Sequence, residues 1–206
     1  MKSWQLLSVA VPALVLLLTG CDDSKNPLSD PQTSKADERL FGLWRERSDD
    51  GEVYYHVGRA GGDFPSGVMR IVGIKHTKGM VEPPEEYLAF PTVLNGKNYL
   101  NMVLEGDKKQ VRLLNEKGWK SDLVNSYTFL RYQVDGDKLT VWVIDEDAKK
   151  KGIKDGKIKG VEEPNRPAKF TDTTENVARF VTAAGDSLWN TKEPGHFERV
   201  KVSKKR

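Results

Sequence analysis

Residues 127–145 read YTFLRYQVDGDKLTVWVID, two apolar stretches on either side of the turn Asp135-Gly136-Asp137. In the second stretch every other residue is leucine or valine, with threonine, tryptophan and isoleucine between them. A period of two is the period of a β-strand, and a glycine-containing turn between two such stretches is typical of a hairpin. This part of the chain therefore predicts antiparallel strands over 127–134 and 138–145.

Six more segments rich in β-branched and aromatic residues extend this pattern along the chain. They are 40–47, 52–59, 67–77, 86–94, 97–105 and 197–202. Asn95-Gly96 separates two of them and is a strong hairpin signal, since both residue types tolerate positive φ. Closure of about eight such strands removes exposed sheet edges. We therefore predict a mainly β fold, an antiparallel meander closing into a barrel of about eight strands, with an open sheet or a sandwich as the alternative.

Two segments break the β pattern and are predicted as helices. The first is short and covers 110–117. The second begins at the capping-box spacing Asp172-Thr173-Thr174-Glu175, continues with apolar residues at helical spacing from Val177 to Leu188, and meets a terminating glycine at Gly185. It is the one α-helix expected in the C-terminal half, before the last strand. Lys149-Lys150-Lys151, next to three acidic residues, is interpreted as a charge-balanced, exposed helix end or loop.

Residues 1–20 are typical of an export signal. Lys2 supplies the positive charge, and the largely apolar run 6–18 is shorter than the roughly 20 residues that a membrane-spanning helix needs. The run ends in Leu18-Thr19-Gly20-Cys21, which resembles the lipobox of bacterial lipoproteins. That resemblance implies a diacylglyceryl group on the Cys21 sulfur, cleavage before Cys21 and acylation of the new amino group. An ordinary secreted protein or a short N-terminal anchor is the alternative.

The chain after the signal is expected to have two parts. Residues 21–38 are polar, contain Pro27 and Pro31, and are predicted to be a lipid-anchored flexible tether. Residues 39–203 are predicted to form a single barrel-like domain. Asp22 resembles the mark that retains lipoproteins at the inner membrane, facing the periplasm; the outer membrane remains the alternative.

Charge and cysteine content exclude several classes of function. Without Lys2, the mature chain has 32 basic and 30 acidic residues, so its charge gives no case for nucleic acid as a partner. Cys21 is the only cysteine, which excludes thiolate metal sites, redox motifs and disulfides within the domain. We predict no cofactor.

Gly42-Leu43-Trp44, on the first predicted strand, resembles the Gly-x-Trp signature of lipocalins and related calycins. In that family the tryptophan closes one end of the barrel beneath a basic residue from near the last strand. Arg199 is placed to be that residue here. The resemblance thus implies a lipocalin-like barrel in which Trp44 and Arg199 are structural.

Candidate ligand-binding residues are Tyr54, His56 and Arg70, which would line a cavity if they point inward. Alternation does not decide this point, because both faces of these strands mix apolar and polar residues. His56, His76 and His196 lack metal-binding spacing, so we predict no metal site and no catalytic residues. An envelope enzyme would need these histidines to converge with carboxylates.

We therefore expect a non-enzymatic envelope lipoprotein. Its partners would be the membrane, reached through the lipid on Cys21, and either a small hydrophobic or amphipathic ligand or an envelope protein. A cavity of several hundred Å³ would favour a small ligand. A filled core would favour a protein partner or a purely structural role.

Overall fold

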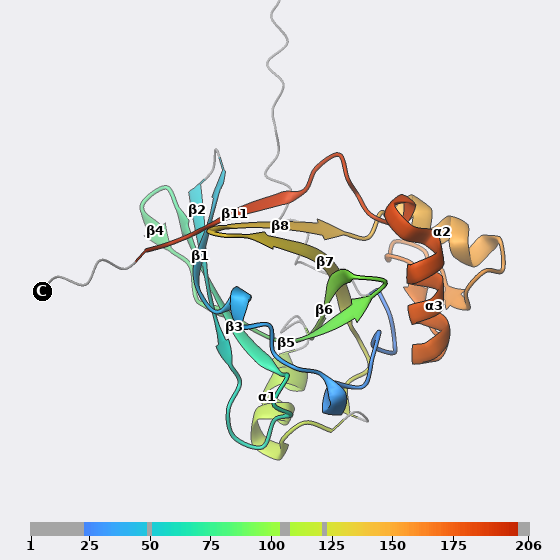
Figure 1. Ribbon diagram of the computed structural model, residues 1–206, viewed down its shortest axis with the longest axis horizontal. Coiled ribbons are helices and arrows are strands. Elements are labelled where there is room, and N and C mark those ends of the chain that lie inside the picture. The colour runs from blue at the N-terminus through green and yellow to red at the C-terminus, as the bar shows by residue number, and fades with distance from the viewer. Residues whose placement is uncertain (1–22, 49–50, 104–107, 121–122, 202–206) are drawn as a thin grey trace, which may run out of the picture.

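The computed structural model of the protein describes residues 23–48, 51–103, 108–120 and 123–201 (Figure 1). The predicted signal segment, the predicted lipidation site Cys21 and Asp22 lie outside the described residues. Figure 1 shows a β-barrel with one pair of helices, α2 and α3, on one side and α1 below it.

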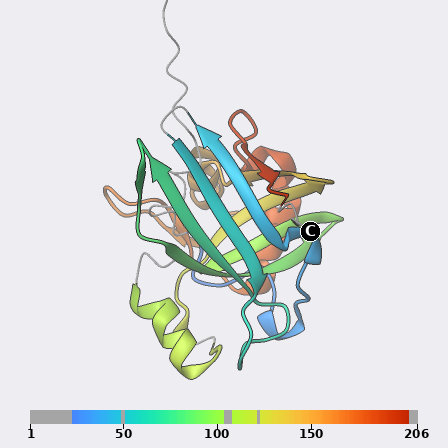
Figure 2. The ribbon, with the colours of Figure 1, turned by 90° about the vertical axis from the view of Figure 1, so that its left-hand side faces the viewer.

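Eight antiparallel strands close the barrel. They are β1 (Gly42–Ser48), β2 (Gly51–Arg59), β3 (Met69–Thr77), β5 (Glu85–Leu94), β6 (Lys97–Val103), β7 (Thr128–Asp135), β8 (Lys138–Val143) and β11 (Gly195–Arg199). Each pairs with its neighbour in the chain, β11 lies between β8 and β1, and the pairing of β2 with β3 completes the ring. A short strand, β4 (Met80–Val81), adds to the edge of β3. The predicted mainly β barrel is confirmed, and Figure 2 shows β1–β3 crossing its near side obliquely.

The two hairpin turns have the backbone that their sequences predict. Asn95 and Gly96 have φ of 48° and 72°, and Gly136 has φ of 57°. Residues with a full side chain rarely adopt these values, so asparagine and glycine set both turns and the strand register that follows from them.

Three α-helices accompany the barrel in the described part of the chain: α1 (Lys108–Lys117), α2 (Glu146–Lys154) and α3 (Thr174–Ala184). Short segments complete the fold: the 3₁₀ turns Pro31–Thr33, Glu38–Leu40 and Gly185–Leu188, and a separate ribbon of β9 (Gly160–Val161) and β10 (Lys169–Phe170). No helix in these ranges is both long and apolar enough to cross a bilayer.

The predicted helix before the last strand is confirmed as α3, with one shift at its start. Thr173, not Asp172, caps it by accepting a hydrogen bond from the amide of Asn176, and Gly185 ends it at φ 57°. The interpretation of 149–151 as an exposed helix end or loop was wrong for Lys149. That residue lies within α2 with only 1% of its surface exposed.

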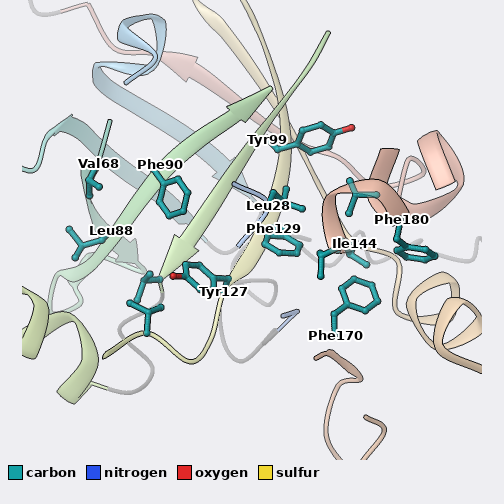
Figure 3. Close-up of a cluster of buried hydrophobic side chains, with 14 of the residues drawn as sticks. Leu28, Val68, Leu88, Phe90, Tyr99, Tyr127, Phe129, Ile144, Phe170 and Phe180 are labelled. Atoms are coloured by element: carbon teal, nitrogen blue, oxygen red, sulfur yellow. The ribbon is translucent and has the colours of Figure 1, made fainter. Parts of the chain in front are cut away.

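Two hydrophobic cores flank the barrel wall, one inside and one outside. The inner core contains Trp44, Tyr55 and Phe197 among others. The outer core packs the far face of β5, β6 and β7 against the helices and loops, and Figure 3 shows part of it, including Phe90, Phe129 and Phe170. Both faces of these three strands are buried, so their burial does not alternate residue by residue as it does in β1, β2 and β8.

Residues 23–34 are part of the fold, which corrects the expectation of a flexible tether for this portion of 21–38. Leu28 is 2% exposed and lies in the outer core (Figure 3). Its amide donates to Asn101 Oδ1 at 2.6 Å, and the Ser34 hydroxyl donates to the Pro91 carbonyl at 2.7 Å. A polar composition thus predicted disorder wrongly here, because a few buried contacts to the barrel hold the segment.

Candidate functional site

The strand alternation places the predicted ligand-binding residues outside the barrel. Val53, Tyr55 and Val57 of β2 are buried, whereas His56 is exposed and Tyr54 is half-buried on the opposite face. The inward orientation considered for Tyr54, His56 and Arg70 was therefore wrong.

Tyr54 and Arg70 have partners on the outer surface. Tyr54 donates to Glu52 Oε2 at 2.6 Å, and its ring meets His76 edge-on at 5.4 Å. Arg70 pairs with Glu86 at 2.5 Å and also donates to Asn115 of α1.

The three histidines do not come together in a cleft. His56, His76 and His196 lie on β2, β3 and β11 and are all exposed. Within the described ranges, no group of three or more histidine, cysteine, aspartate or glutamate residues could hold a metal ion.

Trp44 of β1 lies beneath Arg199 of β11 and is buried in the inner core. The guanidinium carbon of Arg199 lies 4.1 Å from the Trp44 ring centroid, and the two residues are cross-strand neighbours in β11 and β1. The Trp44 indole donates to the Leu40 carbonyl at 2.7 Å, and Arg199 donates to the carbonyls of Phe41 and Arg39. This is the arrangement that the calycin resemblance implies for the pair, and it ties the entering chain to the last strand.

Little space remains inside the barrel. Its cavity has a volume of about 70 Å³ and is lined by apolar and aromatic side chains that include Trp44, Tyr55, Tyr87 and Phe197. Pockets for drug-sized ligands occupy about 300–1,000 Å³. The barrel is therefore essentially filled.

A single carboxyl group interrupts the inner face of β1. Glu46 is 7% exposed, and within the described ranges its Oε2 atom has no hydrogen-bond partner. Burial raises the pKa of Glu46 to about 7, because an ionised carboxylate loses its hydration there. The same burial, together with Glu46 and Glu85, raises the pKa of Tyr55 above its usual range.

A much larger hollow lies outside the barrel, between α2 and α3, and we call it the α2–α3 groove. Its volume is about 750 Å³. Its apolar lining consists of Ala148, Gly152, Phe180, Ala183, Ala184 and Leu188, and its polar lining of Lys151, Lys157, Asp172, Asn176, Arg179 and Ser187. Gly152 permits the close approach of the two helices, since a Cβ there would lie 2.4 Å from the Phe180 ring.

Most charged side chains of the α2–α3 groove have a hydrogen-bond or ion-pair partner in the described ranges of the protein, and Arg179 is the exception. Asp172 accepts hydrogen bonds from the Asn176 side chain and from the amides of Thr173 and Lys159, and these bonds lower its pKa. Lys151 and Lys157 both pair with Asp155, at 3.3 and 3.4 Å.

Arg179 is exposed in the groove, and no ion pair to it is found in the part of the chain that the structure describes. The groove therefore offers an apolar surface beside a guanidinium that has no ion-pair partner among the described residues.

No family model, no curated protein and no solved structure matches the chain.

Sequence reasoning missed the α2–α3 groove because it missed α2. The apolar spacing of 177–188 predicted α3, which forms one wall of the groove and carries Arg179 between Val177 and Phe180. The other wall comes from a nine-residue helix with three consecutive lysines and an internal glycine, a composition that reads as an exposed loop. The cap Asp145, whose side chain accepts from the amide of Ala148, was the available signal.

Proposed function

We propose that this protein is a bacterial envelope lipoprotein, anchored through lipid on Cys21, with a lipocalin-like barrel that carries a non-enzymatic binding site for an amphipathic anion. The site is the α2–α3 groove. The inner membrane, facing the periplasm, is the proposed location. One observation carries the choice of site: the groove has about ten times the volume of the cavity inside the barrel, about 750 against about 70 Å³.

The lining of the α2–α3 groove supports an amphipathic anion as its ligand. Phe180 and Leu188 would contact an acyl or aromatic body, and Arg179 would pair with a carboxylate, phosphate or sulfonate. A guanidinium forms bidentate, charge-assisted hydrogen bonds with such groups. A cationic ligand would meet Arg179, Lys151 and Lys157 at close range, which disfavours it.

The barrel interior supports a structural role in this proposal. Its side chains are large, aromatic and closely packed around a cavity of about 70 Å³, smaller than the engineered cavity of about 150 Å³ that admits benzene. The Trp44–Arg199 contact supports the lipocalin resemblance.

Reversing the charge of Arg179 should weaken binding of an anionic probe about tenfold or more, the effect of losing a charged hydrogen bond. The measurement is native mass spectrometry of the membrane-extracted protein in a non-ionic detergent. Laurate serves as the probe, and dodecyltrimethylammonium as its cationic counterpart. We expect laurate adducts on the parent protein and few on Arg179→Glu.

Arg112→Glu is the matched control for Arg179→Glu, because Arg112 is an exposed residue of α1, outside the α2–α3 groove. The control should bind laurate as the parent does. Equal binding by the parent and Arg179→Glu, or equal binding of laurate and the cation, would rule out this site.

Intact-mass measurement should find the protein without residues 1–20 and with acyl chains on Cys21. Several acyl chains anchor a protein stably because each buried methylene contributes about 0.8 kcal/mol. Cys21→Ala should abolish both the added mass and lipoprotein processing. Recovery of the parent from the cytosol with an intact N-terminus would contradict the lipoprotein assignment.

A further inference from the structure

Asp23 lies two residues after the proposed lipidation site and is buried in the domain. It is 3% exposed, and its Oδ1 atom lies 2.8 Å from the ammonium of Lys149 on α2, which is 1% exposed. The Oδ2 atom accepts from the amide of Phe129 at 2.9 Å. Lys149 also contacts Glu146 at 2.9 Å. Burial lowers the pKa of Lys149, but the two carboxylates outweigh this effect and the pKa of Lys149 is raised. Burial also raises the pKa of Asp23, against the opposing effects of Lys149 and of the Phe129 amide, so the geometry of the contacts and not the pKa values identifies the pair.

Backbone hydrogen bonds hold the same residues on both sides. The amides of Asp23 and Ser24 donate to the Tyr127 carbonyl, and the Tyr127 amide donates to the Ser24 carbonyl at 2.8 Å. On the other side, Phe170 donates to the Asp23 carbonyl and accepts from Lys25, both at 2.8 Å. Residues 23–25 thus lie between the start of β7 and β10 and are hydrogen-bonded to both. These bonds fix the position of residues 23–25 relative to the domain.

We call the ion pair and the hydrogen bonds that hold residues 23–28 the clamp. We propose that the clamp acts as a membrane mount: it fixes the lipid anchor to the domain, so that the headgroup layer of the bilayer contacts the surface around Asp23. The inference rests on the proposed lipidation of Cys21. A chain spans at most about 3.6 Å per residue, so Cys21 lies within about 7 Å of Asp23. A free tether from Cys21 to Leu40 would reach up to about 60 Å, and the clamp removes that freedom.

The surface around Asp23 fits a layer of phospholipid headgroups. Four exposed residues lie next to the clamp or its partners, in the chain or through a backbone hydrogen bond: Lys25, Asn125, Lys159 and Thr171. None of the four is acidic, and two of them are lysines. Cations close to the anchor favour the anionic lipids of a bilayer surface. We call these four residues the mount face.

Hydrogen exchange on the membrane-bound protein tests the clamp without any substitution. The amides of Ser24, Lys25 and Leu28 should be strongly protected, since each donates to a buried acceptor in the domain. Exchange of these amides at the rate of an unstructured chain would overturn the clamp, whatever the chemical state of Cys21.

Labelling at two single cysteines tests the contact with the bilayer. Thr171→Cys places a fluorophore on the mount face, and Asp135→Cys places one at the far end of β7, about 26 Å along the strand from Tyr127. The vesicles contain phosphatidylcholine, phosphatidylglycerol and a lipid with a paramagnetic headgroup. We expect several-fold stronger quenching at position 171 than at position 135. Equal quenching at the two positions would overturn the mount.

Two variants connect this contrast to the ion pair. Lys149→Met leaves the Asp23 carboxyl buried without its partner, which should release the segment and reduce the quenching contrast several-fold. The double variant Asp23→Leu/Lys149→Met replaces the pair with apolar groups, so it should keep the contrast. A full contrast in the single variant, or its loss in the double variant with a folded barrel, would overturn the clamp mechanism.

Failure of the proposed lipoprotein function can be distinguished from failure of the clamp. A protein without acyl chains on Cys21 would overturn the lipoprotein assignment and the membrane contact with it. Protection of Ser24 and Leu28 from exchange would still establish the clamp in that case.

Discussion

Replacing Trp44 with alanine should lower the free energy of unfolding by about 3–5 kcal/mol, the usual cost of truncating a large buried aromatic residue. Trp44 is 1% exposed and lines the cavity inside the barrel. The substitution would also remove the hydrogen bond to the Leu40 carbonyl and the surface on which Arg199 stacks. Urea unfolding followed by circular dichroism measures the change.

Arg199→Met and the double variant isolate the contact between the two side chains. A desolvated cation–π contact is worth about 1–2 kcal/mol, and a double-mutant cycle should return a coupling of that size. A loss below about 1 kcal/mol for Trp44→Ala would be too small for this mechanism. It would mean that Trp44 is not buried in the inner core.

Replacing Glu46 with methionine should stabilise the protein at pH 8 more than at pH 4, by about 2 kcal/mol after allowance for partial solvent screening. Burial raises the folded-state pKa of Glu46 from 4.5 to about 7. The folded protein therefore binds this proton more tightly than the unfolded chain, and the contribution of Glu46 to stability falls as the pH rises from about 4.5 to 7. Above pH 7 the full cost of the buried charge remains, and methionine removes it.

Glu193→Met is the matched control for Glu46→Met, because Glu193 is exposed in the loop before β11. Its effect on unfolding should be the same at both pH values. Urea unfolding of the three proteins at pH 4, 6 and 8 gives the comparison. A gain from Glu46→Met that does not change with pH would contradict the burial of an ionisable carboxyl in the barrel.

The proposed binding site and the proposed membrane mount share one structural element. Helix α2 contributes Lys149 to the clamp and Lys151 and Gly152 to the α2–α3 groove. Both proposals therefore depend on α2, which lies beside α3 (Figure 1). A groove held near the bilayer surface would meet amphipathic anions where lipids are concentrated.

The outer core explains why the inward faces of β5, β6 and β7 could not be predicted from the residues of these strands. Strands β5 to β7 bury both faces, because 23–30, α3 and the segment around Trp119 cover them from outside. Apolar outward residues such as Leu88 and Phe90 then look the same in sequence as inward ones. The sequence left β2 ambiguous for another reason, because tyrosine stands on both of its faces, Tyr55 inward and Tyr54 outward.

The sequence by itself determined the strands, the hairpins and the helix before the last strand. These features depend on interactions between near neighbours: a period of two, positive φ at Asn95 and Gly96, and a cap at Thr173. The pair of Trp44 and Arg199 was accessible as well, through its resemblance to a known pattern.

Only the tertiary structure decided what is buried and what is paired across the chain. Asp23 and Lys149 are 126 residues apart in the chain. Each lies in a polar stretch of the sequence, which predicts a solvent-exposed charge. Nothing local distinguishes them from their exposed neighbours, because the energy of a buried ion pair depends on the partner and on the loss of water around both. The same reason applies to the filled barrel and the α2–α3 groove, whose volumes depend on how distant side chains pack.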